Sequence, residues 1–231
     1  GAMLMRGSRT MTREQIDQRL EQLKTQGSVG GGLQGATIGL QTRREHLADA
    51  LALAADVLRN PAFPESEFEQ LRTQAITGME ASRFEPGAIA GRALAQYFDP
   101  WPAGHPLRNR TLDESLAELK ALKLEDVRAF HRDVYGTAHG EIAIVGDFDA
   151  AAVRAQLEQL FAGWKSGKPF ASIPTQYTDV AAKQARFETP DKPNAVLLAR
   201  HNLPLKVTDA DYPALVVANR IFGGGALKSR L

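Results

Sequence analysis

Apolar residues recur at helical spacing along most of this chain, and that pattern constrains its fold more than any other feature. Side chains three or four residues apart share one helix face, which can then be buried. Such segments lie at residues 12–23, 47–60, 68–79, 89–97, 114–122, 127–134, 149–161 and 212–222. Strand-like patterns are short and far apart, at residues 36–41, 141–145 and 195–199. The sequence therefore predicts an α+β fold, with helices packed on one face of a mainly antiparallel sheet.

The composition of the chain limits what it can bind and where it can reside. Hydrophobic residues make up 43% of the 231 residues and charged residues 24%, a mixture that can build a packed core. The net charge of +1 argues against nucleic acid, whose phosphates require a basic face. No apolar run approaches the roughly 18 residues of a membrane span. The chain has no cysteine, which excludes disulfides and leaves the compartment open between bacterial periplasm and cytoplasm.

Three helix starts carry local capping signals. Thr12 with Gln15, and Thr111 with Glu114, have the spacing of a capping box. Asp149 is placed to cap the helix that follows residues 146–149. The glycine-rich stretch at residues 27–35 is expected to end the first helix as a flexible loop or helix cap.

The titratable residues indicate no catalytic or metal site. The histidines are His46, His105, His131, His139 and His201. No two have the i, i+4 spacing that places two imidazoles on one helix face. The position four residues before His46 is Thr42, so Glu45-His46 does not complete an H-x-x-E-H motif. Asp147 and Asp149 fit turn and cap chemistry better than acid–base catalysis.

A second glycine-rich stretch, Gly223, Gly224 and Gly225, follows a predicted helix. Phosphate-binding loops precede a helix, so this arrangement argues against nucleotide binding. Glycine permits a helix end, a flexible loop or a close approach of backbone to an extended peptide. These three residues are the candidate peptide-chamber or flexible-loop site.

Six short stretches, in this order, resemble one known family. They are Met3-Leu4-Met5-Arg6-Gly7-Ser8, Leu58-Arg59-Asn60-Pro61-Ala62-Phe63, Gly104-His105-Pro106-Leu107, Val145-Gly146-Asp147-Phe148-Asp149, Phe161-Ala162-Gly163-Trp164, and Phe222-Gly223-Gly224-Gly225 with Ser229-Arg230-Leu231. Together they resemble the insulinase/pitrilysin (peptidase M16-like) zinc metallopeptidases over nearly the whole chain. The resemblance implies repeated α+β domains, in two halves that enclose a chamber where peptides are degraded. One half carries H-x-x-E-H and a distal Glu as zinc site, and the other usually lacks them.

The chain departs from the catalytic pattern at both zinc-binding positions. The last motif His corresponds to Ala2, within Gly1-Ala2-Met3, which is typical of a cloning scar. The distal zinc Glu, six residues after the aligned Arg72, corresponds to Gly78. Glu80 lies two residues out of register, which on a helix is a rotation of about 200°. The family's substrate-gripping Arg and Tyr pair is expected beyond Leu231.

Two functions follow from this resemblance. The first is the non-catalytic half of a zinc-dependent metalloendopeptidase, inactive alone, which helps to enclose a peptide chamber. Its partners would be peptide and a zinc-bearing half, in the same polypeptide or another subunit, and the chain itself would need no cofactor. The alternative is a non-proteolytic binding or assembly module of the same descent.

The predicted layout has three parts. Residues 1–165 form a domain that lacks its first strands and zinc motif, residues 166–185 a linker, and residues 186–231 a truncated second α+β domain. Such a layout leaves strand edges unpaired at residues 36–41 and 141–145. It also leaves the apolar helix at residues 212–222 without a packing partner. A second copy of the chain is the simplest one, so we expect a homodimer.

Overall fold

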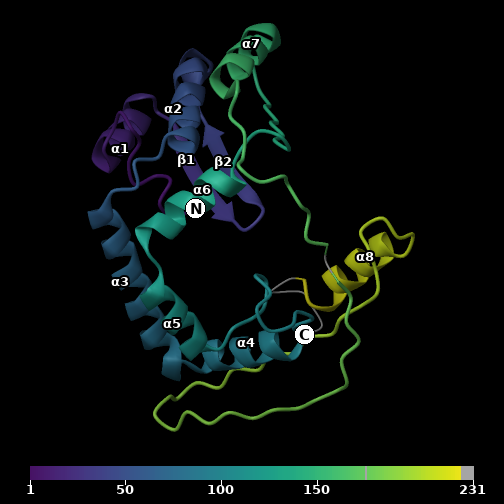
Figure 1. The fold of residues 1–231 in the computed structure, drawn as a ribbon. Coiled ribbons are helices and arrows are strands. Elements are labelled where there is room, and N and C mark those ends of the chain that lie inside the picture. The colour runs from purple at the N-terminus through teal and green to yellow at the C-terminus, as the bar shows by residue number, and fades with distance from the viewer. Residues whose placement is uncertain (175, 225–231) are drawn as a thin grey trace. The chain divides into compact units, whose positions relative to one another are not determined.

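The computed structural model describes residues 1–174 and 176–224, and the helices lie where the apolar periodicity predicts them (Figure 1). The chain divides into two compact units. The first unit comprises residues 1–85 and 110–174, and the second comprises residues 86–109 and 175–231. No helix among the described residues has the length and apolar character needed to cross a membrane.

The first unit contains most of the regular structure. Its helices are α1 (Arg13–Gln22), η1 (Arg44–His46), α2 (Leu47–Arg59), α3 (Glu65–Ala81), η2 (Ser82–Phe84), α5 (Leu112–Ala121), α6 (Leu124–Val134) and α7 (Ala150–Phe161). Its strands are β1 (Gln26–Gly32) and β2 (Gly35–Gln41). They form a two-stranded antiparallel hairpin, in which Gly30 pairs with Thr37. The predicted α+β character is thus present as a helix-rich unit with a small antiparallel sheet.

Helix α2 is the centre of the first unit. Seven of its side chains are buried: Ala50, Leu51, Leu53, Ala54, Ala55, Val57 and Leu58. Leu53 and Val57 pack with Ile16 of α1, while Leu58 packs with Leu4 and Phe63 in a second cluster. Burying each large side chain contributes about 1.5–3 kcal/mol, so this helix supplies much of the unit's stability.

The second unit contains α4 (Pro86–Tyr97) and α8 (Tyr212–Phe222). Between Phe161 and Tyr212 the described residues form no helix or strand. Tyr97 anchors part of this irregular segment, because its hydroxyl donates to the Ala181 carbonyl at 2.8 Å and Lys183 lies over its ring. The predicted division of the chain at residues 166–185 stays a prediction.

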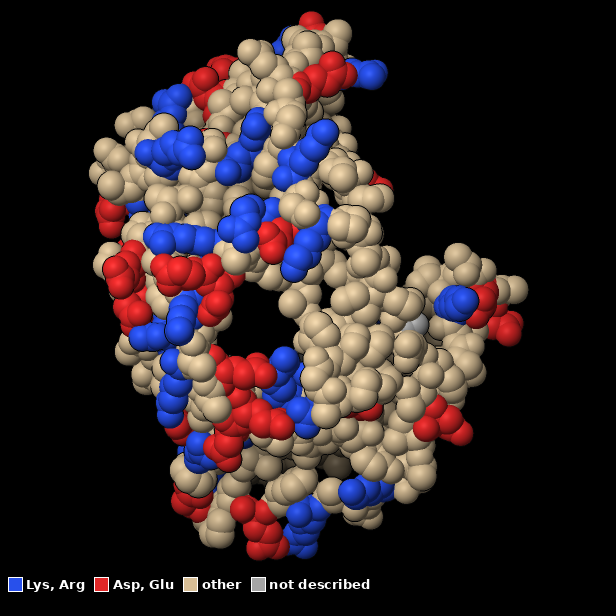
Figure 2. All heavy atoms as spheres, in the orientation of Figure 1, with Lys and Arg blue, Asp and Glu red and all other residues tan. Residues whose placement is uncertain are grey.

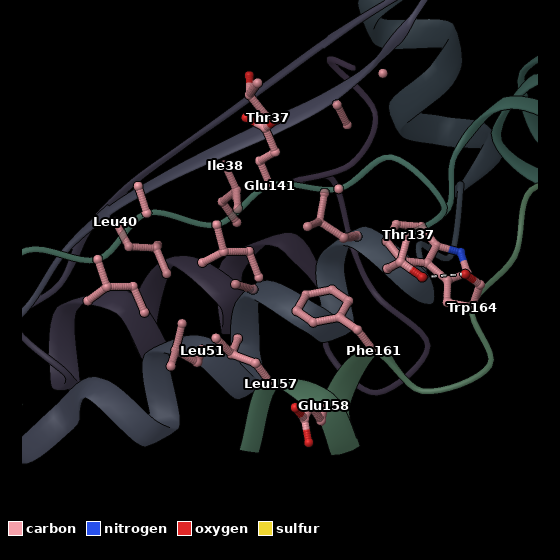
Figure 3. A pocket seen from close by; sticks show the side chains of 18 of the residues that line it. Thr37, Ile38, Leu40, Leu51, Thr137, Glu141, Leu157, Glu158, Phe161 and Trp164 are labelled. Carbon is pink, nitrogen blue, oxygen red and sulfur yellow. Dashed lines mark hydrogen bonds between the residues drawn. The ribbon is translucent and has the colours of Figure 1, made fainter. Parts of the chain in front are cut away.

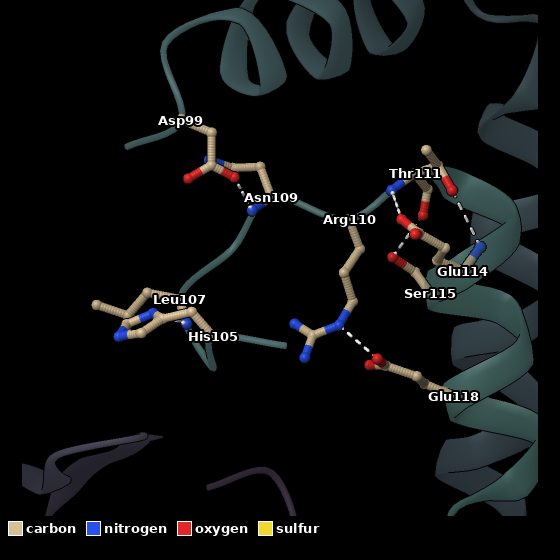
Figure 4. Close-up of polar contacts among 9 residues, drawn as sticks. All are labelled: Asp99, His105, Leu107, Asn109, Arg110, Thr111, Glu114, Ser115 and Glu118. Carbon is tan, nitrogen blue, oxygen red and sulfur yellow. Dashed lines mark hydrogen bonds and ion pairs between the residues drawn. The ribbon is translucent and has the colours of Figure 1, made fainter. Parts of the chain in front are cut away.

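All three capping predictions are confirmed. Thr12 and Gln15 exchange hydrogen bonds at the start of α1, as Thr111 and Glu114 do at the start of α5 (Figure 4). Asp149 Oδ1 accepts from the Ala151 and Ala152 N–H groups at the start of α7. Each capping side chain forms its hydrogen bonds with residues at most three positions away. These caps could therefore be predicted from the sequence alone.

The strand predictions are confirmed only in part. Residues 36–41 form β2, but the glycine-rich stretch expected to be a loop or helix cap is its partner β1. The prediction was wrong for residues 27–32 because glycines have no side chains that could show the alternation of apolar and polar residues typical of a strand. Gly31 has a reason to lack a side chain: a Cβ there would lie 2.7 Å from the Tyr135 hydroxyl. Residues 141–145 and 195–199 are not strands, since neither has a hydrogen-bonded neighbour among the described residues.

Candidate functional site

A groove of about 940 Å³ lies beside β2 in the first unit. One wall is β2 and the other is the segment 134–148, while α2 and α7 form the floor. In Figure 3, Leu51, Leu157 and Phe161 of the two helices line it together with Ile38 and Leu40 of β2. We call this cavity the β2 groove.

Helix α7 is fixed to α2 along the floor of the β2 groove. The Gln156 side-chain amide donates to the Ala48 carbonyl at 2.7 Å. Arg59 at the end of α2 donates to the carbonyls of Leu160 and Ala162 at the end of α7. At the far end Thr137 Oγ1 donates to the Trp164 carbonyl at 2.8 Å (Figure 3). The floor and the ends of the groove are therefore held by polar contacts as well as by packing.

The zinc-equivalent positions carry no metal ligand. Ala2 lines a second cavity of about 290 Å³, with Met3, Leu4, Phe68 and Arg72 among its lining residues. Arg72 donates to the Leu122 carbonyl at 3.2 Å and pairs with Glu69. Neither Ala2 nor Arg72 offers an oxygen, nitrogen or sulfur lone pair that zinc accepts. The polar side chains of this cavity are Arg72, His131 and Tyr135, and among the described residues no three His, Asp or Glu side chains gather there to hold a zinc ion.

The distal position is equally unsuited to metal. Gly78 lies in α3, and a Cβ built on it would meet no atom within 4 Å. Glu80 pairs with Arg83 at 3.0 Å. Its carboxylate is therefore engaged by η2, the short 3-10 helix that follows α3.

The histidines occupy separate environments. His46 Nε2 lies 3.4 Å from Glu45, and His139 packs against the Phe170 ring. In the second unit His105 stacks on Trp101 at 3.9 Å, and its Nδ1 accepts from the Leu107 N–H at 3.2 Å (Figure 4). Across residues 1–174 and 176–224, no three His, Asp or Glu side chains gather as a metal site would require.

His131 has the most distinctive surroundings of the histidines. Its Nε2 lies 2.7 Å from the Leu58 carbonyl, and rings of Phe63, Tyr135 and Trp164 surround it. Burial lowers the pKa of the His131 imidazole below its usual value, against a smaller raising effect of the Leu58 hydrogen bond. The folded protein therefore favours the neutral imidazole. His131 has a structural role.

Asp147 and Asp149 have the turn and cap roles that the sequence predicts. Asp147 pairs with Arg44 at 2.6 Å and so ties the start of the α2 region to the turn before α7. Asp149 is the N-cap of α7. The two carboxylates therefore serve separate partners.

The glycine candidates lie at the end of α8. The Gly223 N–H donates to the Asn219 carbonyl at 3.0 Å and closes the helix. A Cβ on Gly224 would lie 2.7 Å from the Arg220 Cα, so its backbone approaches its own helix closely. Gly225 lies outside the described residues. Their role at a peptide chamber remains a prediction.

Surface charges are mixed in sign. On the face shown in Figure 2, acidic and basic side chains alternate over the surface. Many are paired, as Arg6 is with Glu67 at 2.8 Å and Arg19 with Asp49 at 2.8 Å. This face offers no basic stripe of the kind that follows a phosphate backbone.

Comparisons with known proteins bear on the family. Residues 121–231 match the family model described as the peptidase M16 inactive domain. These residues include the stretches at 145–149, 161–164 and 222–231 on which part of the resemblance rests. Residues 121–231 are thus similar to an insulinase-type, non-catalytic repeat.

A solved structure similar to this chain supports its fold. It is the crystal structure of a peptidase M16 inactive domain from Pseudomonas fluorescens, with a TM-score of 0.70 and 24% sequence identity. The match covers 99% of this chain and 54% of the other, so this chain spans about half the length of that one. No curated protein matches this chain.

The β2 groove was not predicted from the sequence. Both walls were found as strand patterns, at residues 36–41 and 141–145, but were not placed on either side of a cavity. The missing information is nonlocal, because the two segments are about 100 residues apart in the chain. The sequence signal that could have indicated the groove is the apolar pattern of both segments, together with the apolar faces of α2 and α7.

Proposed function

We propose that this chain is the non-catalytic half of a zinc-dependent metalloendopeptidase and helps to enclose its peptide chamber. The single observation that carries the proposal is Gly78, which stands at the distal zinc-equivalent position. Gly78 presents no side chain, in a chain whose residues 121–231 match the peptidase M16 inactive domain. Zinc and the water that it activates would then belong to the other half.

Reconstitution tests this function directly. The chain is mixed with the H-x-x-E-H-bearing polypeptide encoded with it, and cleavage of a fluorogenic peptide is followed. An enclosed chamber positions substrate and excludes water, so we expect kcat/KM to rise at least about tenfold over the zinc half alone. Size-exclusion chromatography should show the two chains eluting together.

Two results would contradict the proposal. Coelution without any change in kcat/KM would favour a non-proteolytic assembly module of the same family. If the two chains do not associate at micromolar concentrations, the zinc half is not a partner of this chain. A zinc half whose motif Glu is changed to Gln is the control, because it should bind the chain equally and remain inactive.

The finer fold and layout belong to the same proposal. In the complete protein we propose helices on one face of a mainly antiparallel sheet, with residues 1–165 in one domain and residues 186–231 beginning the next. Gly223, Gly224 and Gly225 would then lie at the chamber. Limited proteolysis should cut first within residues 166–185, and early cuts within residues 124–163 would contradict this layout.

A further inference from the structure

Residues 165–171, which follow the end of α7, lie along the C-terminal end of α6 in the same unit. The Gly167 N–H donates to the Arg132 carbonyl at 2.9 Å. The Lys168 N–H donates to the Asp133 carbonyl at 2.9 Å, and the Lys168 ammonium lies 3.4 Å from the Asp133 carboxylate. These contacts join residues 35 positions apart in the sequence, so they are tertiary contacts and not a local turn. We call residues 165–171 the strap.

The near end of the strap is fixed by Trp164. Its side chain packs against one of the two buried apolar clusters, and its carbonyl accepts from the Thr137 N–H at 3.1 Å and the Thr137 hydroxyl at 2.8 Å (Figure 3). Beyond Trp164 the strap is exposed apart from the half-buried Ser166, and Phe170 is 45% exposed although it packs on the His139 ring. Polar contacts therefore hold the strap with little apolar burial, and segments held in this way open locally at a small fraction of the free energy of global unfolding.

Two glycines allow the close approach of the strap to the end of α6. A Cβ on Gly136 would overlap the Ser166 nitrogen, and a Cβ on Gly167 would lie 3.3 Å from Asp133 Oδ1. Neither glycine has the left-handed φ that would by itself favour this residue. The approach of the strap is therefore the structural reason for glycine at position 136.

We propose that the strap is a latch, which opens and closes on the end of α6 while the rest of the first unit stays folded. Closed, it keeps residues 165–171 out of the connection that leads to the second unit, whose later segment begins at residue 175. Open, it lengthens that connection by seven residues, which is about 23 Å of extended chain at about 3.3 Å per residue. The Lys168 side chain is 72% exposed, so its ion pair with Asp133 makes the closed state sensitive to salt. The latch does not involve a zinc half and is independent of the function proposed above.

Amide hydrogen exchange on the full 231-residue chain, resolved by residue with NMR, tests the latch. The Gly167 and Lys168 amides should exchange at least about tenfold more slowly than unprotected amides, but much faster than amides of α2, because they open without global unfolding. Low concentrations of urea should accelerate the α2 amides and leave these two unchanged, since local opening exposes little surface. Raising salt from about 0.05 M to about 0.5 M should speed exchange of the two amides about two- to fivefold, because it screens an exposed ion pair.

Substitutions separate the latch from the fold. Gly136→Ala should speed exchange of the Gly167 amide at least about tenfold and leave the α2 amides unchanged, because the new Cβ displaces the strap. Gly140→Ala is the matched control, since its Cβ would lie at an ordinary contact distance of 3.6 Å from the Thr137 carbonyl oxygen. Lys168→Gln should exchange at low salt as the unaltered chain does at high salt, and should lose the response to salt.

Chymotrypsin gives a second measurement of the open population, because cleavage of a transiently opened segment follows how often it is open. Cleavage after Phe170 should become faster in Gly136→Ala. Cleavage after Tyr177, which lies in the second unit and is 51% exposed, should keep its rate.

Three outcomes would overturn the proposal. Exchange of the Gly167 and Lys168 amides as slow as that of α2 would make the strap a fixed part of the core. Exchange at the unprotected rate would mean that the strap is not closed in solution. Equal effects of Gly136→Ala and Gly140→Ala would mean that close approach at Gly136 does not hold the strap. Should Gly136→Ala unfold the first unit, unchanged exchange in Lys168→Gln would overturn the latch instead.

Discussion

At the scale of single residues, the buried His131 imidazole couples stability to pH. Its folded-state pKa is lowered by burial, so the folded chain binds fewer protons there than the unfolded chain. A group of this kind contributes its full stability above the unfolded pKa, near 6.5, and loses it as pH falls toward the folded pKa. The Phe63, Tyr135 and Trp164 rings pack around the half-buried imidazole and reduce the contact of its charged form with solvent.

We therefore expect the free energy of unfolding to decrease as pH falls from about 7 to about 5. The variant His131→Gln should lose about 1–3 kcal/mol at pH 7, because the Leu58 carbonyl loses its partner, and should show a flatter pH dependence. Urea denaturation at several pH values measures both. His139→Gln, at an exposed position, is the control. A pH slope that His131→Gln leaves unchanged would assign the dependence to other groups.

At the scale of elements, helix α1 shows how local chemistry sets both helix ends. It begins at the Thr12–Gln15 capping box. At its other end Lys24 N–H donates to the Glu21 carbonyl and Thr25 N–H to the Leu20 carbonyl, each at 2.9 Å. This is a Schellman ending, and it holds Lys24 at φ +47°, a left-handed conformation that favours glycine.

Lys24→Gly should therefore stabilise the chain, by about 0.5–1 kcal/mol, because glycine adopts this conformation without the Cβ penalty. Thermal unfolding followed by circular dichroism measures the change. Lys24→Ala removes the same charge but keeps a Cβ, so it should give no gain. Equal stabilisation by both variants would point to charge rather than conformation.

The elements also show where sequence reasoning succeeds. Helix faces and caps were predictable, because Thr12, Thr111 and Asp149 meet their partners within one turn. β1 was not, because its glycines lack side chains that would alternate. The segment 141–145 has the pattern of a strand, but a pattern cannot supply the neighbour that makes it one. The two cavities require distant segments to meet, so neither could be located from the sequence.

At the scale of the whole molecule, the fold resembles that of a peptidase-family domain, and we propose that this chain does not supply that family's metal site. Residues 121–231 match the peptidase M16 inactive domain, and the whole chain has the fold of a solved M16 inactive domain. The positions that resemblance assigns to zinc ligands are Ala2 and Gly78, neither of which can bind a metal through its side chain. The central claim is that any metal chemistry lies outside this chain.

Elemental analysis of the purified chain, after dialysis against excess zinc and then buffer, tests that claim most directly. Zinc should be present at far less than one ion per chain, and the same sample should not hydrolyse a fluorogenic peptide above the buffer rate. A measured content of about one zinc per chain that disappears in His46→Ala would contradict the account, as would hydrolysis that a chelator abolishes.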